Sequence, residues 1–342
     1  MIFVSAVSDR LYFGMWTFPP YQWLHFNITQ SLAIFYGTNR WDYYLTEGLP
    51  LLLTTSLPFA VPALWSSSST FAATRLDFVA NVRFQLALTI MTMIAILSAV
   101  SHKEVRFIYP LLPSLHVLTA PHILSFFNAT PLVITIKNTS DRAVISIRSW
   151  RRALLVAFVV TNLCISIYVT QIHQRGVMDV LTLLRRDYEN THLVDHRVVP
   201  TLAPDQNETF VGFLMPCHST AWRSRLVYPT LRAWALTCEP PLDIPAGTRT
   251  RAIYRDEADR FYDAPDVFLR TEVGTGARPW PRYVVGFEGI EGQLRRHVAE
   301  TMPGTGMRRK WDLFNSHWHD DWRRVGRVIV WEFVATGLRP AV

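Results

Sequence analysis

The sequence predicts an α-helical membrane region with several spans, followed by a soluble α/β or α+β domain. Of its 342 residues, 49% are hydrophobic and 18% are charged, against about 25% charged in ordinary globular chains. Long apolar segments fill the first half, whereas Arg, Asp, Glu and Pro dominate after about Gln171. A split of this kind is typical of a membrane region joined to a soluble domain. We therefore divide the chain into residues 1–43, 44–170 and 171–342.

The membrane region contains about four segments that approach the roughly 20 residues needed to cross a bilayer. They are Tyr44–Trp65, Phe78–Val100, Phe107–Phe127 and Ala153–Thr170. The first and third contain prolines, which membrane helices tolerate where neighbouring groups satisfy the backbone. Any one segment by itself is compatible with a buried core helix. Four in series, joined by short polar loops, favour membrane spans.

The basic stretch Asn128–Arg152 predicts the orientation. It carries five Lys or Arg residues against the single acid Asp141, and the positive-inside rule places such a loop in the cytosol. Successive spans cross the membrane in opposite directions, so the Ser66–Asp77 loop, two spans earlier, is expected in the cytosol as well. The Ser101–Arg106 loop, the amphipathic segment 1–43 and residues 171–342 are then expected in the lumen.

The soluble half shows a mixture of periodicities. Gly176–Glu189 and Asp256–Tyr262 have helical apolar spacing. Three stretches are rich in the Val, Ile, Tyr and Phe residues that favour strands, namely Val211–Met215, Arg282–Phe287 and Arg327–Val334. These patterns leave α/β and α+β both open.

Cys217 and Cys238 lie in this soluble half. They would be able to form a disulfide if it faces an oxidising lumen. Two unrelated buried thiols are an equally good interpretation, because a chain with only three cysteines has no recognisable disulfide framework.

Charge and spacing exclude two other classes of function. The formal net charge is +7, but the basic residues are scattered or lie beside apolar runs, which indicates membrane topology rather than nucleic-acid binding. The run His317–Asp321 (HWHDD) places its side chains next to one another rather than one helical turn apart, so it predicts a polar turn and no metal site.

The densest group of polar residues is SHKEVRFIYPLLP, at residues 101–113 between the second and third apolar segments. One interpretation is a solvated turn whose bases extend toward water. The other is a cationic site for a phosphate, because Arg and Lys bind phosphate oxygens well and are costly to leave unpaired near lipid. Composition alone does not choose between them.

This motif resembles the HKExRF-type signature of the dolichyl-phosphate-mannose-dependent mannosyltransferases of glycosyltransferase family 22. Other stretches resemble the branch of the family that builds glycosylphosphatidylinositol (GPI) anchors, and the resemblance extends from about Asp9 to Phe333. They include SDRLYFGMWTFPPYQWLHFNI, SLAIFYGTNRWDYYLTEGLPLLL, FLMPCHSTAWRSRLVYP, WALTCEPPL, YRDEADRFYDAP, WPRYVVGFEGIE and FNSHWHDDWRRVGRVIVWEFV.

The resemblance implies a multi-pass protein of the endoplasmic reticulum membrane with part of a GT-C-type fold. Its expected activity is transfer of the third mannose, through an α-1,2 linkage, from dolichyl-phosphate mannose to the GPI precursor, with no cofactor. Lys103 and Arg106 are expected to contact the donor phosphate, and His102 and Glu104 to orient them or to bind sugar hydroxyls. The family's catalytic acid lies in an early lumenal loop, so we expect the general base upstream of this chain, which looks N-terminally truncated.

Further candidate residues lie outside the motif. Asp9, Arg10 and Glu47 are candidates for contact with the acceptor. Asn27 and Asn207 are the glycosylation sequons that the topology places in the lumen.

Two alternatives stay open. One is a non-catalytic, membrane-anchored lumenal module that binds a glycolipid or a protein partner. The other is a sister dolichyl-phosphate-mannose-dependent enzyme of N-glycan precursor assembly.

Overall fold

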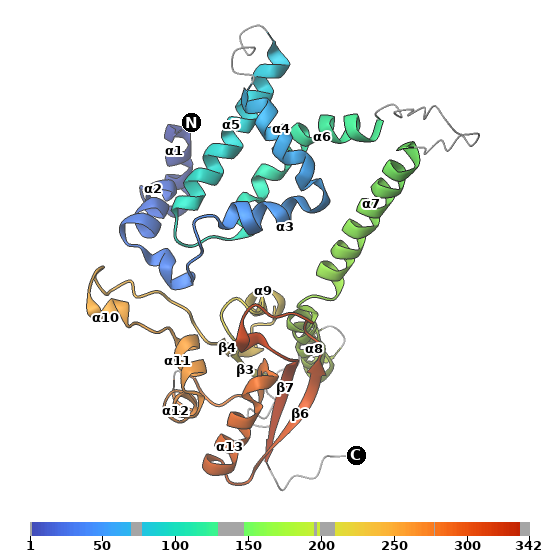
Figure 1. Ribbon diagram of the computed structural model, residues 1–342. Helices are drawn as coiled ribbons and strands as arrows, with labels where there is room; N and C mark the ends of the chain where they lie inside the picture. The colour runs from blue at the N-terminus through green and yellow to red at the C-terminus, as the bar shows by residue number, and fades with distance from the viewer. Residues whose placement is uncertain are drawn as a thin grey trace, which may run out of the picture. The chain divides into compact units, whose positions relative to one another are not determined.

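The computed structural model describes residues 2–69, 77–128, 147–194, 197–198, 209–276 and 278–335. The chain forms two compact units, residues 1–165 and 166–342 (Figure 1). The first consists of helices, and the second contains a β-sheet with helices packed on it.

The first unit combines α-helices with short 3-10 and π-helical turns. Its α-helices are α1 (Ile2–Phe13), α2 (Pro19–Leu24), α3 (Leu49–Leu53), α4 (Leu57–Ser69), α5 (Phe78–Ala99), α6 (Leu112–Asn128) and α7 (Ile147–Gln171), which continues into the second unit. Its other helical turns are η1 (His25–Thr29), η2 (Leu32–Tyr36), η3 (Tyr44–Gly48), η4 (Thr54–Ser56) and η5 (Val105–Leu111).

Four helical stretches in the described residues are long and apolar enough to cross a membrane. They are Tyr44–Ser69, Phe78–Ala99, Val105–Asn128 and Trp150–His192. The four predicted segments are thus confirmed as candidate membrane helices. Most of the predicted cytosolic loop, residues 129–146, lies outside the described residues, so the orientation remains a prediction.

Two of these stretches are less regular than the predicted single helices. The first is interrupted at Thr54, whose φ of 48° is unusual for a β-branched residue. The third begins with the 3-10 turn η5, which contains Pro110. Proline has no amide hydrogen to donate to the helix, which explains why the regular α-helix α6 starts only after it.

Small side chains allow α4, α5 and α6 to pack closely. Ala60, Ala63 and Ala87 are buried at their contacts, next to Ile90 and Ile108. The remaining surfaces of these helices expose large apolar side chains such as those of α5. Helices in lipid are expected to pack through small residues and to turn large ones outward.

The second unit contains helices on both sides of a sheet. Its helices are α8 (Arg175–His192), α9 (Trp222–Arg225), α10 (Arg249–Ala252), α11 (Glu257–Asp263), α12 (Pro265–Thr271) and α13 (Glu291–Thr301), with 3-10 turns η6 (Glu288–Ile290) and η7 (Trp322–Arg324). Its strands are β1 (Leu193–Val194), β2 (Arg197–Val198), β3 (Phe210–Leu214), β4 (Arg232–Ala235), β5 (Tyr283–Phe287), β6 (Thr305–Leu313) and β7 (Val328–Ala335).

The main sheet has five strands in the order β4-β3-β5-β7-β6. Strand β3 is parallel to both β4 and β5, whereas β7 is antiparallel to β5 and β6. The sheet is therefore mixed, with crossover connections in its first part and a hairpin at its end. It combines features of the two predicted classes.

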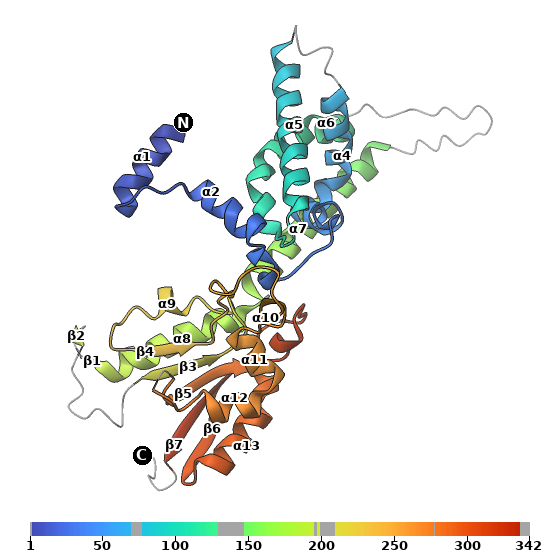
Figure 2. The ribbon, with the colours of Figure 1, turned by 90° about the vertical axis from the view of Figure 1, so that its left-hand side faces the viewer.

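Two hydrophobic cores lie on opposite faces of this sheet. Helix α8 packs on one face through Val180, Leu181 and Leu184, and helices α11, α12 and α13 cover the other (Figure 2). Because both faces are covered, β3 and β5 are buried along their whole length. This explains why their sequences are continuous apolar runs.

Candidate functional site

The residues of the HKEVRF motif lie at the start of the third candidate span and contact a loop that is distant in sequence. Asn39 N donates to the Ser101 carbonyl oxygen (3.0 Å), and Asn39 Oδ1 accepts from Lys103 N (2.9 Å). His102 Nδ1 lies 3.3 Å from the Gly37 carbonyl oxygen. The loop of residues 37–42 therefore holds the motif in place, a role that sequence reasoning missed.

Glu104 is the centre of the charged contacts. Its Oε1 lies 2.9 Å from His102 Nε2 and accepts from Arg106 Nη2 (2.7 Å), while Oε2 pairs with Arg106 Nε. Partial burial by itself would raise the pKa of Glu104. The hydrogen bonds and positive charges of His102 and Arg106 outweigh that effect and lower the pKa, so Glu104 is a carboxylate at neutral pH.

Lys103 occupies a different position from the one the sequence suggested. It is only 4% exposed, and its Nζ donates to the Asn39 carbonyl oxygen (3.2 Å). Removal from water lowers its pKa. The ammonium group is thus hydrogen-bonded to the loop of residues 37–42, and its burial keeps it from contact with a ligand.

Arg106 is the cation of the motif that remains open to a ligand. Its side chain is 68% exposed, and its guanidinium group lies 5.8 Å from the centre of the Phe107 ring. The pairing with Glu104 fixes one edge of the guanidinium and leaves its other N–H groups available. Such a group binds phosphate oxygens through charge-assisted hydrogen bonds.

The predicted acceptor residues are spread more widely. Asp9 and Arg10 belong to α1, where Asp9 accepts from Ser5 Oγ (3.4 Å) and Arg10 lies 6.0 Å from the Trp16 ring. Glu47, in η3, is exposed. It acts together with Glu104 to raise the pKa of Tyr43, after the larger effect of burial. Glu47 is therefore near the motif, whereas the contacts of Asp9 and Arg10 are local.

Of the two predicted glycosylation sites, the structure describes only Asn27. Asn27 lies in the π-helical turn η1, and its Nδ2 donates to the Trp23 carbonyl oxygen (2.8 Å). A glycan on that nitrogen would compete with this bond. Asn207 lies outside the described residues.

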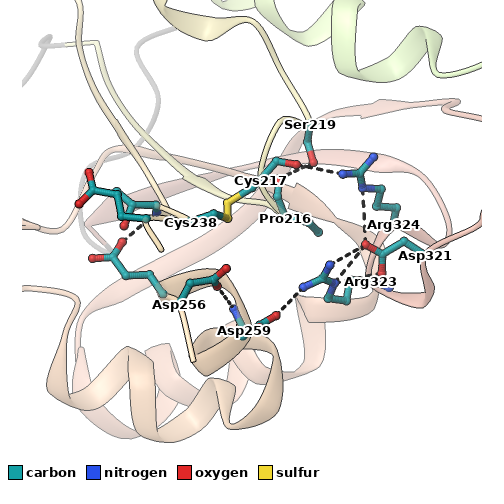
Figure 3. The surroundings of a disulfide bond; sticks show 12 residues. Pro216, Cys217, Ser219, Cys238, Asp256, Asp259, Asp321, Arg323 and Arg324 are labelled. Atoms are coloured by element: carbon teal, nitrogen blue, oxygen red, sulfur yellow. Dashed lines mark hydrogen bonds and ion pairs between the residues drawn. A yellow bond between two sulfur atoms is a disulfide. The ribbon is translucent and has the colours of Figure 1, made fainter. Parts of the chain in front are cut away.

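Cys217 and Cys238 form a disulfide in the second unit, with 6.0 Å between their Cα atoms (Figure 3). Of the two interpretations left open by the sequence, the structure has the paired one. The residues follow β3 and β4, which are parallel neighbours, so their loops leave the sheet at the same edge.

Ionic contacts surround the disulfide (Figure 3). Arg324 Nη2 donates to the Cys217 carbonyl oxygen (2.9 Å). Arg323 pairs with Asp321 through two nitrogens and with Asp259 through Nη1 (2.9 Å). Burial by itself would raise the pKa of Asp321, but its bonds to Arg323 lower it. These pairs fasten the loop between β6 and β7 to the rest of the unit.

Comparison with known proteins identifies the family. The sequence profile of the Alg9-like mannosyltransferases matches residues 1–227, which include the whole candidate site. The chain belongs to the Alg9-like mannosyltransferase family.

Individual family members are similar along nearly the whole chain. A GPI mannosyltransferase 3 of Gibberella zeae is 46% identical over 96% of this chain, and one of Aspergillus fumigatus is 41% identical over 96%. The GPI alpha-1,2-mannosyltransferase 3 of Mus musculus is 30% identical over 95%. The chain covers 54%, 45% and 49% of these relatives, or about half of their length. No solved structure matches it.

Proposed function

We propose that this chain forms the donor-phosphate part of a mannosyltransferase of GPI-anchor synthesis. The reaction would transfer the third mannose, through an α-1,2 linkage, from dolichyl-phosphate mannose to the GPI precursor. The family membership and the names of the relatives support the reaction class. The observation that carries the assignment to this site is the Glu104 carboxylate joined to both His102 and Arg106 at the end of a candidate membrane span.

Each residue of the motif has a distinct role in this proposal. Arg106 binds the phosphate of the donor and stabilises the negative charge that develops on it as the sugar departs. Glu104 is a positioning residue that sets the direction of the guanidinium, and His102 in turn holds Glu104. Lys103 keeps the loop of residues 37–42 against the motif.

The position of the motif suits a lipid-linked donor. The Val105–Asn128 stretch begins at the motif and is apolar enough to cross the membrane, so Arg106 lies where a polar headgroup meets the lipid chains. We further propose that this end faces the lumen of the endoplasmic reticulum. The Cys217–Cys238 disulfide supports a lumenal second unit, because disulfides persist in oxidising compartments.

The test compares Arg106→Ala with Arg83→Ala in the full-length protein that carries this chain. Arg83 is an exposed cation near the opposite end of α5 and is the matched control. Loss of one charge-assisted contact is worth roughly 1.5–3 kcal/mol, or about ten- to a hundredfold in rate.

The readout is accumulation of the two-mannose GPI intermediate in cells depleted of their own GPI mannosyltransferase 3. We expect accumulation with Arg106→Ala and near-normal transfer with Arg83→Ala. Equal transfer by the two variants would reduce Arg106 to a surface charge and refute the proposed role.

A further inference from the structure

The loop between β6 and β7 carries the exposed aromatic side chains of the second unit. Phe314, Trp318 and Trp322 in this loop are 37%, 70% and 69% exposed. Among the described residues of the unit, every other large apolar side chain that is exposed to this degree is non-aromatic. Tryptophan is buried to a large extent in most folded proteins, and exposed apolar patches mark surfaces that bind proteins or membranes. The loop is therefore a candidate interaction surface.

This loop is attached to the end of α7. Tyr168 Oη lies 3.1 Å from His317 Nδ1, and the ring centres of Tyr168 and Trp318 are 5.2 Å apart. Just beyond the helix, Arg175 N donates to the Asn315 carbonyl oxygen (3.1 Å). All these residues belong to the second unit. The position of the loop next to the helix end is thus set by contacts inside one compact unit.

The end of α7 is also the place where a candidate membrane helix becomes polar. The stretch Trp150–His192 is apolar enough to cross a membrane, and Ile167 and Val169 near the end of α7 are 49% and 54% exposed. The sequence then continues as TQIHQR. The helix is interrupted at Gln174, where φ is 55°, and α8 beyond it packs on the sheet. The membrane surface is therefore expected close to Gln171.

The residues of the loop suit the headgroup region of a bilayer. Tryptophan and tyrosine are enriched there because each has an apolar ring and a polar N–H or O–H group. Asp320 of the same loop is exposed, and a carboxylate is costly inside the hydrocarbon, so the loop is expected to lie on the bilayer and not to cross it. A protein partner would also cover exposed tryptophans. The contact of Trp318 with the end of a candidate membrane helix favours lipid.

We infer that the β6–β7 loop, residues 314–327, docks on the surface of the lipid bilayer, with the Trp318 ring at the level of the headgroups. The loop would be a second point of attachment of this unit to the membrane, beside α7. It would restrict rotation of the unit about the axis of the helix. The inference does not depend on the reaction that the protein catalyses.

The test measures the surroundings of position 318 with a nitroxide spin label. The 342-residue chain is placed in phosphatidylcholine nanodiscs. Cys164, which is free, is replaced by serine, so that Trp318→Cys supplies the only thiol for labelling while Cys217 and Cys238 stay paired. Electron paramagnetic resonance then measures collisions of the label with oxygen, which concentrates in lipid, and with a nickel chelate, which stays in water.

Val267→Cys is the matched control. Val267 is 61% exposed on α12, a helix on the face of the sheet opposite α8. We expect the ratio of oxygen to nickel collisions to be clearly higher at position 318 than at position 267. Equal ratios would place the loop in water and overturn the inference. Few collisions with either reagent at position 318 would mean that protein covers the loop, which would overturn the inference as well.

A second measurement needs no label. Trp318→Phe keeps an aromatic ring on an exposed side chain, so the unfolding temperature should be retained. The difference in fluorescence between the unmodified chain and Trp318→Phe is the emission of Trp318. This emission should decrease when the lipids are brominated on their acyl chains close to the headgroup, because bromine quenches tryptophan on contact. Equal emission in plain and brominated lipid would overturn the inference independently of the spin label.

Discussion

Glu104 of the first unit and Glu332 of the second are both carboxylates that accept hydrogen bonds from arginine. Glu104 accepts a hydrogen bond from the largely exposed cation Arg106 at the end of an apolar helix. Glu332 is 2% exposed on β7 and bonds with Arg282 and Arg308. Burial by itself would raise the pKa of each carboxylate. Hydrogen bonds with His102 and Arg106 lower the pKa of Glu104, and those from Arg308 and Arg282 lower the pKa of Glu332.

The difference lies in what surrounds each carboxylate. Ion pairs are numerous in the second unit, as around Arg309, which contacts Glu288, Glu291 and Asp312. A charged pair in the second unit is therefore one of many ion pairs that stabilise its fold. In the first unit charged groups adjoin helices that expose apolar surface, where unpaired charge is costly. The same chemical pair therefore points to structure in one unit and to function in the other.

The largest effect on stability is expected from the disulfide of the second unit. Replacing Cys217 and Cys238 by serine removes a link between residues separated by 21 positions, which should cost about 3 kcal/mol in the free energy of unfolding. Thermal unfolding of the chain in detergent measures it. Cys164→Ser is the control, because Cys164 is free and exposed. Equal unfolding temperatures for the Cys217/Cys238 double variant and for Cys164→Ser would mean that the disulfide does not stabilise the second unit.

Glu332→Gln tests the structural carboxylate. The variant leaves Arg282 and Arg308 facing a neutral amide, so we expect a loss of about 1–3 kcal/mol. Glu300→Gln, which breaks an exposed pair with Arg270, should cost less than about 1 kcal/mol. A loss no greater for Glu332→Gln than for Glu300→Gln would contradict the structural role.

The stabilisation by Glu332 should also depend on pH. Its pKa is lower in the folded chain than its usual value of 4.5. The contribution is then fully present above pH 4.5 and is lost as the pH falls toward the folded-state pKa. The gap in unfolding temperature between the unmodified chain and Glu332→Gln should close on acidification. A gap that stays constant down to acid unfolding would exclude this linkage.

Glu104→Gln tests the positioning carboxylate and sharpens the comparison most directly. The amide weakens the hold on Arg106, so the mannose transfer proposed for the full-length protein should fall by about five- to tenfold, with little change in unfolding temperature. Glu332→Gln should show the reverse pattern, lower stability and unchanged transfer per folded molecule. If both variants lose only stability, Glu104 is structural as well.

The smallest effect is expected within the apolar helices. Asn162 on α7 bonds through Oδ1 with Thr54 Oγ1 and through Nδ2 with Thr55 Oγ1, each at 2.8 Å. Asn162→Leu should cost about 0.6 kcal/mol and at most about 1.7, the range found for polar contacts between membrane helices. Val160→Leu, on an exposed part of α7, is the control. Unfolding in mixed micelles measures both, and a gain in stability from Asn162→Leu would contradict the expectation.

The sequence by itself determined the helices and strands that are surrounded by apolar groups on all sides. In a bilayer every spanning segment must be apolar, so composition alone was enough for the four candidate membrane helices. Strands β3, β5 and β7 lie inside the sheet, and their apolar runs were recognised. Strands β4 and β6 were missed because they form the two edges of the sheet. Edge strands are partly exposed and accept polar residues such as Arg308 and Arg309.

Only the tertiary structure decided which polar groups meet. The HKEVRF motif was visible in the sequence, but its support by Gly37 and Asn39, the burial of Lys103 and the exposure of Arg106 depend on how the loop of residues 37–42 packs. The pairing of Cys217 with Cys238 likewise depends on β3 and β4 being parallel neighbours. These contacts join residues far apart in the chain, and no local pattern of residues encodes which distant groups come within hydrogen-bond distance.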